Sequence, residues 1–252
     1  MMLVDAHCHL SMGRLARKLP EVIKRAKERN LIAIVTSTIS PEDFSVTRKL
    51  VEKYKGYVFI SLGLHPPGVN PTTLMKTIEL IKKHQREIVA IGEVGLDYYW
   101  VKDEKRREFQ RAAFREFIKL SDETNLPLVI HSREAGHDTF KILEECDAKR
   151  VMLHCFSDST DMAAYAVKKG WLISIPTTVT RRKVHKDAAS VTPLDSMLVE
   201  TDSPFLSPFG GVNEPANVYY AVEAIARIKG VDIETVANKT SENALKFFEI
   251  SI

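Results

Sequence analysis

Several features that mark other classes of protein are scarce or absent in this sequence. Only three cysteines occur, Cys8, Cys146 and Cys155, and no two of them have CxxC spacing. An odd number of scattered cysteines argues against a disulfide framework and suits a reducing cytoplasm, where we expect the protein to reside. No apolar run approaches the roughly 18 residues that a transmembrane helix needs, so we expect no membrane partner.

Charge and terminal composition argue against two further classes. The formal net charge is only +3, which is too small to indicate a nucleic-acid partner from electrostatics alone. The first residues run directly into an apolar stretch without a basic region or cleavage site, so we expect no secretory signal. Linkers, low-complexity segments and long repeats are also lacking. We therefore predict a single domain over residues 1–252, and we expect a monomer.

Short apolar runs alternate with longer charged stretches of helical periodicity along the whole chain. Eight runs are predicted as strands, within residues 1–10, 31–38, 57–66, 88–97, 126–132, 150–157, 171–175 and 196–204. Predicted helices include residues 15–29, 103–124, 214–228 and 232–248, and two others begin at Ser40-Pro41 and Asn70-Pro71. This alternation predicts an α/β fold, a single (β/α)8 TIM barrel. A doubly wound sheet would require a Gly-rich phosphate loop after the first strand, and none occurs there.

Histidines gather at the predicted strand ends, where the active site of such a barrel is built. Five of the eight histidines lie there, together with two acidic residues: His7, His9, His65, Glu93, His131, His154 and Asp202. The remaining histidines are expected to be solvated because their surroundings are charged: His84, His137 and His185. On a strand, side chains alternate between faces, so we expect Asp5, His7 and His9 to project together.

Imidazole nitrogen and carboxylate oxygen are ligands for Zn²⁺, Mn²⁺ or Mg²⁺. Four imidazoles and two carboxylates exceed what one tetrahedral ion accepts but suit two ions, and a carboxylate between them can bridge. A positive dinuclear centre would attract an anionic substrate such as a phosphate. Cys8 and Cys155 flank the histidines but should point to the opposite strand face, so we interpret them as small buried apolar residues.

Motifs along nearly the whole chain resemble those of the TatD family of metal-dependent hydrolases, TatD-like DNases within the amidohydrolase-type barrels. They are VDAHCH at 4–9, SLGLHP at 61–66, IGEVGLDYY at 91–99, LPLVIHSRE at 126–134, LHCFS at 153–157, LVETDSP at 198–204 and NEPANV at 213–218. The resemblance implies two divalent metal ions (Zn, Mn or Mg) held by His7, His9, Glu93, His131, His154 and Asp202, with Glu93 bridging. It also implies phosphodiesterase activity on DNA, often 3′–5′ exonucleolytic.

Residues beside these ligands receive supporting roles. His65 is predicted to contact the phosphate or leaving group, or else to anchor a loop. Arg133 is predicted to clamp a phosphate oxygen, or else to form a surface ion pair with Glu134 or another neighbour. Four polar residues are predicted to hydrogen-bond ligands or loops from outside the coordination sphere: Asp5, Asp97, Asn213 and Glu214.

The chain departs from the family pattern at three places. Pro67 replaces the second histidine of GxHPH, Asp158 replaces the glycine of HCFSG, and Val212 stands where many relatives carry an arginine. All three changes lie in predicted substrate-facing loops, and none alters a predicted ligand. Glu93 occupies the position where related barrel hydrolases place a carbamylated lysine, which argues against the phosphotriesterase or dihydroorotase type.

The resulting hypothesis is a two-metal phosphodiesterase in which a metal-bound water attacks DNA, with Asp202 and Glu93 as catalytic residues. One alternative is a metal-dependent deacylase that cleaves an ester or amide bond, in an aminoacyl-tRNA or a small metabolite. Another is a nucleic-acid-binding protein with a structural metal site. Closed structural sites usually use cysteine, whereas mixed nitrogen and oxygen ligands at a barrel mouth favour open coordination positions.

Overall fold

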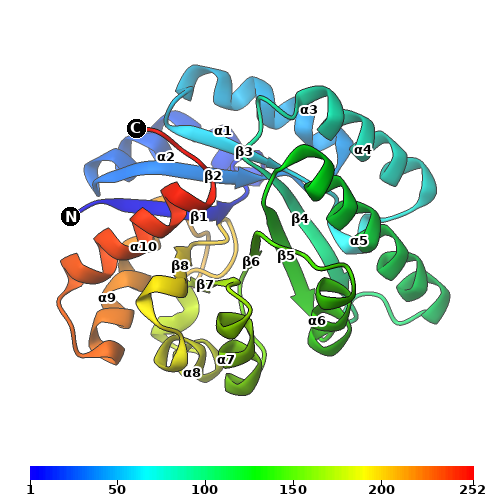
Figure 1. Ribbon diagram of the computed structural model, residues 1–252. Coiled ribbons are helices and arrows are strands. Elements are labelled where there is room, and N and C mark those ends of the chain that lie inside the picture. The colour runs from blue at the N-terminus through cyan, green and yellow to red at the C-terminus, as the bar shows by residue number, and fades with distance from the viewer.

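A computed structural model describes all residues 1–252 and contains eight parallel strands in sequential order, with helices around them (Figure 1). The strands are β1 Leu3–Cys8, β2 Leu31–Ser37, β3 Val58–Leu62, β4 Ala90–Asp97, β5 Leu128–Arg133, β6 Val151–Leu153, β7 Leu172–Pro176 and β8 Met197–Glu200. The helices are α1 Gly13–Arg17, α2 Leu19–Glu28, α3 Pro41–Val51, α4 Pro71–His84, α5 Glu104–Thr124, α6 Gly136–Glu145, α7 Thr160–Lys168, α8 Lys183–Val191, α9 Val218–Lys229 and α10 Ile233–Phe247. The predicted barrel is confirmed.

Hydrogen bonds between the first and last strands bring the sheet nearly to closure. Backbone bonds run from Asp202 N to the His7 carbonyl (2.9 Å) and from His9 N to the Ser203 carbonyl (2.7 Å). The buried Asp5 carboxylate adds two more, because it accepts from the backbone N (2.8 Å) and the hydroxyl (2.6 Å) of Thr201. Asp5 therefore ties β1 to the segment that follows β8.

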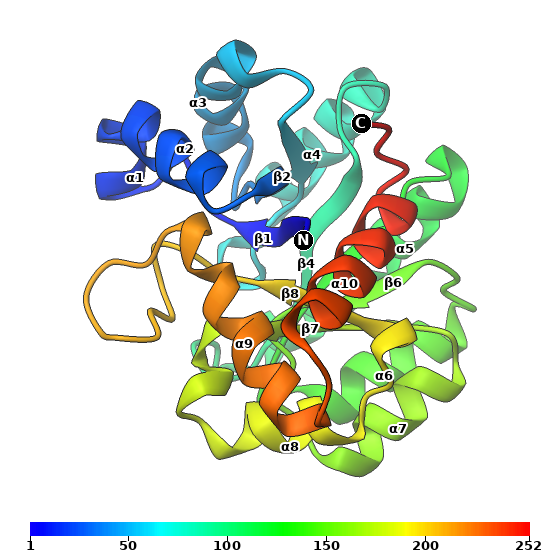
Figure 2. The same ribbon diagram turned by 90° about the vertical axis from the view of Figure 1, so that its left-hand side faces the viewer.

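Apolar side chains fill the barrel at the end opposite the predicted site. Alternate strand residues point inward, including Val4, Ala33, Val129 and Leu198, and all are buried. The end of the chain, including Phe248 just after α10, packs against the same cluster. Figure 2 shows α10 beside the N-terminus of β1. This end of the barrel is a packed core, which leaves the carboxyl ends of the strands for polar groups.

Polar side chains directly before the first turn cap half of the helices. Ser40 accepts a hydrogen bond from Asp43 N, and Asn70 forms a capping box with Thr73, each directly before a proline in the first turn. The predicted helix over residues 15–29 is instead two helices, α1 and α2, which meet at Lys18. Pro20 explains the break, because its ring excludes the carbonyl of the preceding turn and it lacks a backbone donor.

The expectation that His84, His137 and His185 are solvated holds only for His137, whose side chain is 92% exposed. His185 is completely buried on α8 and hydrogen-bonds Thr178 through Nδ1 (2.8 Å). His84 is mostly buried too, against the Phe44 ring and the Glu87 carboxylate. Charged neighbours in sequence were a poor guide, because residues one apart on a helix face different directions.

Candidate metal centre

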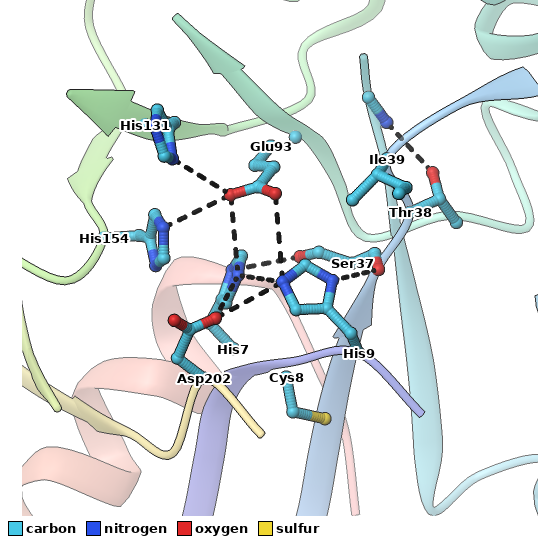
Figure 3. Close-up of polar contacts among 12 residues, drawn as sticks. His7, Cys8, His9, Ser37, Thr38, Ile39, Glu93, His131, His154 and Asp202 are labelled. Atoms are coloured by element: carbon cyan, nitrogen blue, oxygen red, sulfur yellow. Dashed lines mark hydrogen bonds and ion pairs between the residues drawn. The ribbon is translucent and has the colours of Figure 1, made fainter. Parts of the chain in front are cut away.

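Six side chains from five strand ends converge at the carboxyl-terminal mouth of the barrel (Figure 3). They are His7, His9, Glu93, His131, His154 and Asp202. Asp202 follows β8 by two residues in a left-handed backbone conformation (φ 51°). The residues that the sequence pattern gathers into one hypothetical site are therefore close together in space.

The Glu93 carboxylate lies at the middle of this group. Its Oε2 atom is 3.2 Å from His154 Nε2 and 3.4 Å from His131 Nδ1, whereas Oε1 faces His9 Nε2 at 3.8 Å. His7 Nε2 is 3.8 Å from Oε2. One carboxylate thus faces histidines on both sides of the barrel mouth, which is the placement that a bridging ligand requires.

Asp202 faces the histidine pair of β1 from the other side. Its Oδ1 atom is 3.3 Å from His9 Nε2 and 3.7 Å from His7 Nε2, and these two nitrogens are 3.3 Å apart. Two ligands each about 2.0–2.1 Å from one ion in tetrahedral geometry are themselves about 3.3 Å apart. The spacing of these donor atoms therefore fits a shared cation.

In each of the four imidazoles, one ring nitrogen faces the carboxylates of the site, and the other contacts a neighbouring side chain or backbone carbonyl. His131 Nε2 donates to Asp97 (3.0 Å), and His154 Nδ1 donates to Glu200 (3.1 Å). On β2, Ser37 serves both histidines of β1: its carbonyl accepts from His9 Nδ1 (3.0 Å), and its hydroxyl contacts His7 Nδ1 (3.1 Å). Such partners fix the tautomer and aim the free nitrogen inward, as in metal sites generally.

An extra residue in each of two strands, β1 and β4, sets the direction of the central side chains of this group. The β1–β2 pairing runs from Asp5 opposite Ile34 to Cys8 opposite Thr36, three residues against two. A similar shift in β4 surrounds Glu93. A bulge of this kind reverses the alternation of side chains beyond it. The prediction that Asp5 projects with His7 and His9 is therefore wrong, because Asp5 lies on the other face and contacts Thr201.

The electrostatics of the group keep the central Glu93 carboxylate ionised. Burial alone would raise the pKa of Glu93, but the imidazoles of His65, His131 and His154 hold it well below its ordinary value. Burial, reinforced by His154 and His9, places the pKa of His7 well below its ordinary value. Glu93 and His7 are therefore in the protonation states in which they can ligate a divalent cation, whereas the pKa values of His9, His131 and His154 are raised by nearby carboxylates, so a cation must displace a proton from these three rings.

His65, which is predicted to contact the substrate or to anchor a loop, lies next to the group of six side chains. The His65 ring lies against His131, with centroids 4.7 Å apart, and burial lowers the pKa of His65 to about 4. Nitrogen and oxygen atoms of His65, Asp97 and His131 lie within 4.8 Å of one another. The His65 imidazole is therefore neutral near neutral pH and lies within the mouth of the barrel.

Asn213 and Glu214 brace the loop that carries Asp202 and do not touch an imidazole. The Asn213 amide donates to the Thr201 carbonyl (2.8 Å), next to Asp202. Glu214 accepts three hydrogen bonds from Arg25 of α2, the shortest at 2.6 Å. Both residues thus act on the position of the β8–α9 loop.

Two residues that support the imidazoles, Ser37 and Glu200, are missing from the sequence-based set. Glu200 is completely buried, and its Oε2 atom has no hydrogen-bond partner. Its signal in the sequence is an acidic residue inside an otherwise apolar strand run, two positions before Asp202. Ser37 offered no such signal, because one of its two contacts is made by a backbone carbonyl.

The two flanking cysteines differ in their surroundings. Cys8 is completely buried, and its thiol contacts the Val35 carbonyl at 3.5 Å, so it lies away from the imidazoles as predicted. Cys155 is partly buried and has a left-handed backbone (φ 47°). Neither thiol belongs to the group of ligand-type atoms.

Comparison with known proteins agrees with this geometry. The family model described as TatD related DNase matches residues 4–249. The chain is 36% identical over 258 residues to the Homo sapiens protein called deoxyribonuclease TATDN3, covering 98% of this chain and 94% of that one. It is 38% identical to an uncharacterized metal-dependent hydrolase, MJ1582, of Methanocaldococcus jannaschii, covering 98% and 96%.

Solved structures show the same fold. The crystal structure of YJJV, a TatD homolog from Escherichia coli K12, superposes with a TM-score of 0.91 at 25% identity, covering 99% of this chain and 98% of that one. An uncharacterized amidohydrolase from Saccharomyces cerevisiae superposes with a TM-score of 0.84 at 17% identity, covering 98% and 99%. The second likeness supports the barrel architecture alone.

None of the helices in the present structure combines the length and apolarity needed to cross a bilayer.

Proposed function

Because the chain belongs to the family of TatD-related DNases, metal-dependent hydrolases, we propose that it cleaves phosphodiester bonds of DNA with two divalent metal ions. The proposed ligands are His7, His9, Glu93, His131, His154 and Asp202, with Glu93 shared between the ions. The observation that carries the proposal is the central Glu93 carboxylate, whose two oxygens face histidines from opposite sides of the barrel. We further propose that residues 1–252 act as one hydrolase domain, because the ligands come from β1 through to the loop after β8.

The donor set suits Zn²⁺, Mn²⁺ or Mg²⁺. Within it, Glu93 and Asp202 supply the carboxylates, whose negative charge would offset part of the positive charge of the ions. When bound, such ions lower the pKa of a coordinated water and neutralise charge on a phosphate. Ser37, Asp97 and Glu200 hold the imidazoles in place, so little reorganisation is needed when the site is loaded.

Proton transfer is assigned to Asp202. Its side chain is 15% exposed, against 4% for Glu93, so it is the carboxylate that an incoming water and substrate can reach. We assign to its carboxylate the orientation of the attacking water and acceptance of its proton. Its backbone N bond to the His7 carbonyl keeps the carboxylate over the β1 histidines while it acts.

Substrate contact is assigned to His65 and Arg133. The neutral His65 ring is placed to donate a hydrogen bond to the departing oxygen, since it lies beside His131 at the mouth. Arg133 ends β5, two residues beyond His131, and its guanidinium can bind a phosphate oxygen in bidentate fashion. Both residues would stabilise the negative charge that develops on oxygen atoms as the P–O bond breaks.

A hydrolysis panel with defined metals tests the proposal. Purified protein is stripped with EDTA, reloaded with Mn²⁺, Mg²⁺ or Zn²⁺, and assayed on single-stranded DNA, RNA, a p-nitrophenyl phosphodiester, an aminoacyl ester and an N-acyl amide. We expect nucleotide release from DNA that EDTA abolishes and that Glu93→Ala lacks. A matched control is Glu145→Ala, which removes a half-exposed carboxylate of α6 outside the site. Turnover of the acyl substrates with no nucleotide release would favour a deacylase, and DNA binding without any turnover would favour a structural metal site.

A further inference from the structure

A pocket of about 290 Å³, here called the α2 pocket, lies between α1, α2 and the loop that precedes α9. Figure 2 shows this loop beside α1 and α2. The lining includes three cations and three apolar side chains: Arg14, Lys18 and Arg25, with Leu15, Val22 and Val212. None of the six proposed metal ligands lines the pocket, so it is separate from the metal centre.

Two of the three cations have no partner in the protein. The side chains of Arg14 and Lys18 are exposed, and neither makes an ion pair or a hydrogen bond. Many other surface cations are paired, and Lys102, for example, lies 3.2 Å from the Glu134 carboxylate. Glu134 pairs with this lysine and not with Arg133, so the alternative prediction of an Arg133–Glu134 ion pair is wrong. Two unpaired positive charges at one pocket favour an anionic ligand.

The third cation, Arg25, is held in place and still has free donors. Its Nε and Nη2 atoms donate to the two carboxylate oxygens of Glu214, with a shortest distance of 2.6 Å. Nη1 makes no hydrogen bond, although a guanidinium has five N–H donors in one fixed plane. Glu214 is the one carboxylate that lines the pocket, so the formal charge of the lining is +2. The pocket therefore combines an oriented guanidinium with an excess of positive charge.

Buried groups fix the walls of the α2 pocket before any ligand binds. Asn213, which lines it, is completely buried, and its amide donates to the Thr201 carbonyl (2.8 Å). The backbone N of Glu214 donates to the side-chain oxygen of Asn213 (3.0 Å). On the helical wall, Leu15 and Val22 are each 2% exposed and belong to the apolar core. A pocket with walls held in this way needs little reorganisation when a ligand binds.

We propose that the α2 pocket binds a dianionic phosphate group, either inorganic phosphate or the terminal group of a phosphomonoester. Arg14 and Lys18 would form ion pairs with its oxygens, and Arg25 would donate through Nη1. Above about pH 6 a phosphomonoester carries close to two negative charges, which match the formal charge of the lining. A phosphodiester in a nucleic-acid backbone carries one negative charge and matches it less well. This inference goes beyond the proposed function, because the pocket contains none of the proposed metal ligands.

Calorimetric titration of the full chain tests the inference. The protein is kept in a phosphate-free EDTA buffer above about pH 7, so that the metal centre holds no ion and the monoester probe is a dianion. The probes are inorganic phosphate, thymidine 5′-monophosphate and dimethyl phosphate, which is a diester with a single negative charge. We expect one binding site for each of the first two and an affinity at least about tenfold lower for the diester, which lacks one charged contact. Tighter binding of the mononucleotide supports a phosphomonoester as the occupant, and equal affinity supports inorganic phosphate.

Variants of exposed side chains show where the probe binds. Lys18→Gln and Arg14→Gln each remove one charged contact and should lower the affinity for inorganic phosphate by about 10- to 100-fold. Arg17→Gln removes the same charge from α1 at a residue that does not line the pocket, and it should keep the affinity of the unmodified protein. If Arg14→Gln were to misfold, Lys18→Gln would still decide the question.

Three results would overturn the inference: no binding to the unmodified protein, equal affinity for dimethyl phosphate, or an equal loss in all three variants. Each is measured without metal and without turnover. The inference and the proposed function can therefore fail independently of each other.

Discussion

Replacement of Glu200 by glutamine should weaken metal binding without unfolding the barrel. The Glu200 carboxylate is completely buried and accepts the Nδ1 proton of His154 at 3.1 Å, which leaves Nε2 of that ring facing Glu93 at 3.2 Å. Glutamine keeps the size of the side chain but removes its charge, and its amide group can donate to Nδ1. The ring would then place a proton on Nε2, where a metal must bind.

The size of the effect follows from the role of such outer partners. Their loss typically lowers metal affinity by about 10- to 100-fold. That range corresponds to about 1.4–2.7 kcal/mol of binding free energy. The loss should fall on one of the two proposed ions more than on the other, because His154 faces Oε2 of Glu93, whereas Oε1 faces His9.

Calorimetric titration of the stripped protein with Mn²⁺ or Zn²⁺, in a buffer containing a competing chelator, measures affinity and stoichiometry. A closely matched control exists in Glu87→Gln, because Glu87 accepts from His84 Nδ1 at 3.0 Å on the outer surface, outside the site. Glu87→Gln should bind metal as the unmodified protein does. Unchanged affinity and stoichiometry in Glu200→Gln, at an unchanged Tm, would refute the argument that His154 is a ligand oriented by Glu200.

Three further predictions address chemistry, pH and packing. Asp202→Asn should lower kcat by about 10²- to 10⁴-fold with a much smaller change in KM, and an undiminished kcat in steady-state assays would contradict its role in proton transfer. Burial, with Arg182 nearby, lowers the pKa of His185 to about 4, so the unfolded chain binds the proton first as pH falls. The contribution of His185 to stability should therefore be full above about pH 6.5 and decrease by up to about 3 kcal/mol toward pH 4, and the pH dependence of urea unfolding should be shallower by that amount in His185→Gln. Phe117→Ala should cost about 3–5 kcal/mol in urea unfolding, because the ring is 1% exposed in the core under α5, and a loss below about 1 kcal/mol would show that the site collapses around the cavity.

The barrel and the proposed ligand set could be predicted from local patterns alone. Apolar runs of strand length, alternating with helical periodicity, specify buried parallel strands, because only helices on the outside can cover them. Polar residues at the ends of those runs then share one edge of the sheet. His7, His131 and His154 could be placed together for that reason, although more than 100 residues separate the first from the last two.

Features that depend on contacts between distant segments were decided only by the tertiary structure. The bulge in β1, which turns Asp5 away from His7, arises from pairing with β2 and leaves no mark in strand periodicity. Glu200 and Ser37 gained their roles from the imidazoles that the barrel brings against them, and His185 was buried by the packing of α8. Side-chain type and spacing determine which groups reach the barrel mouth, but backbone register and burial determine which atom of each group faces inward.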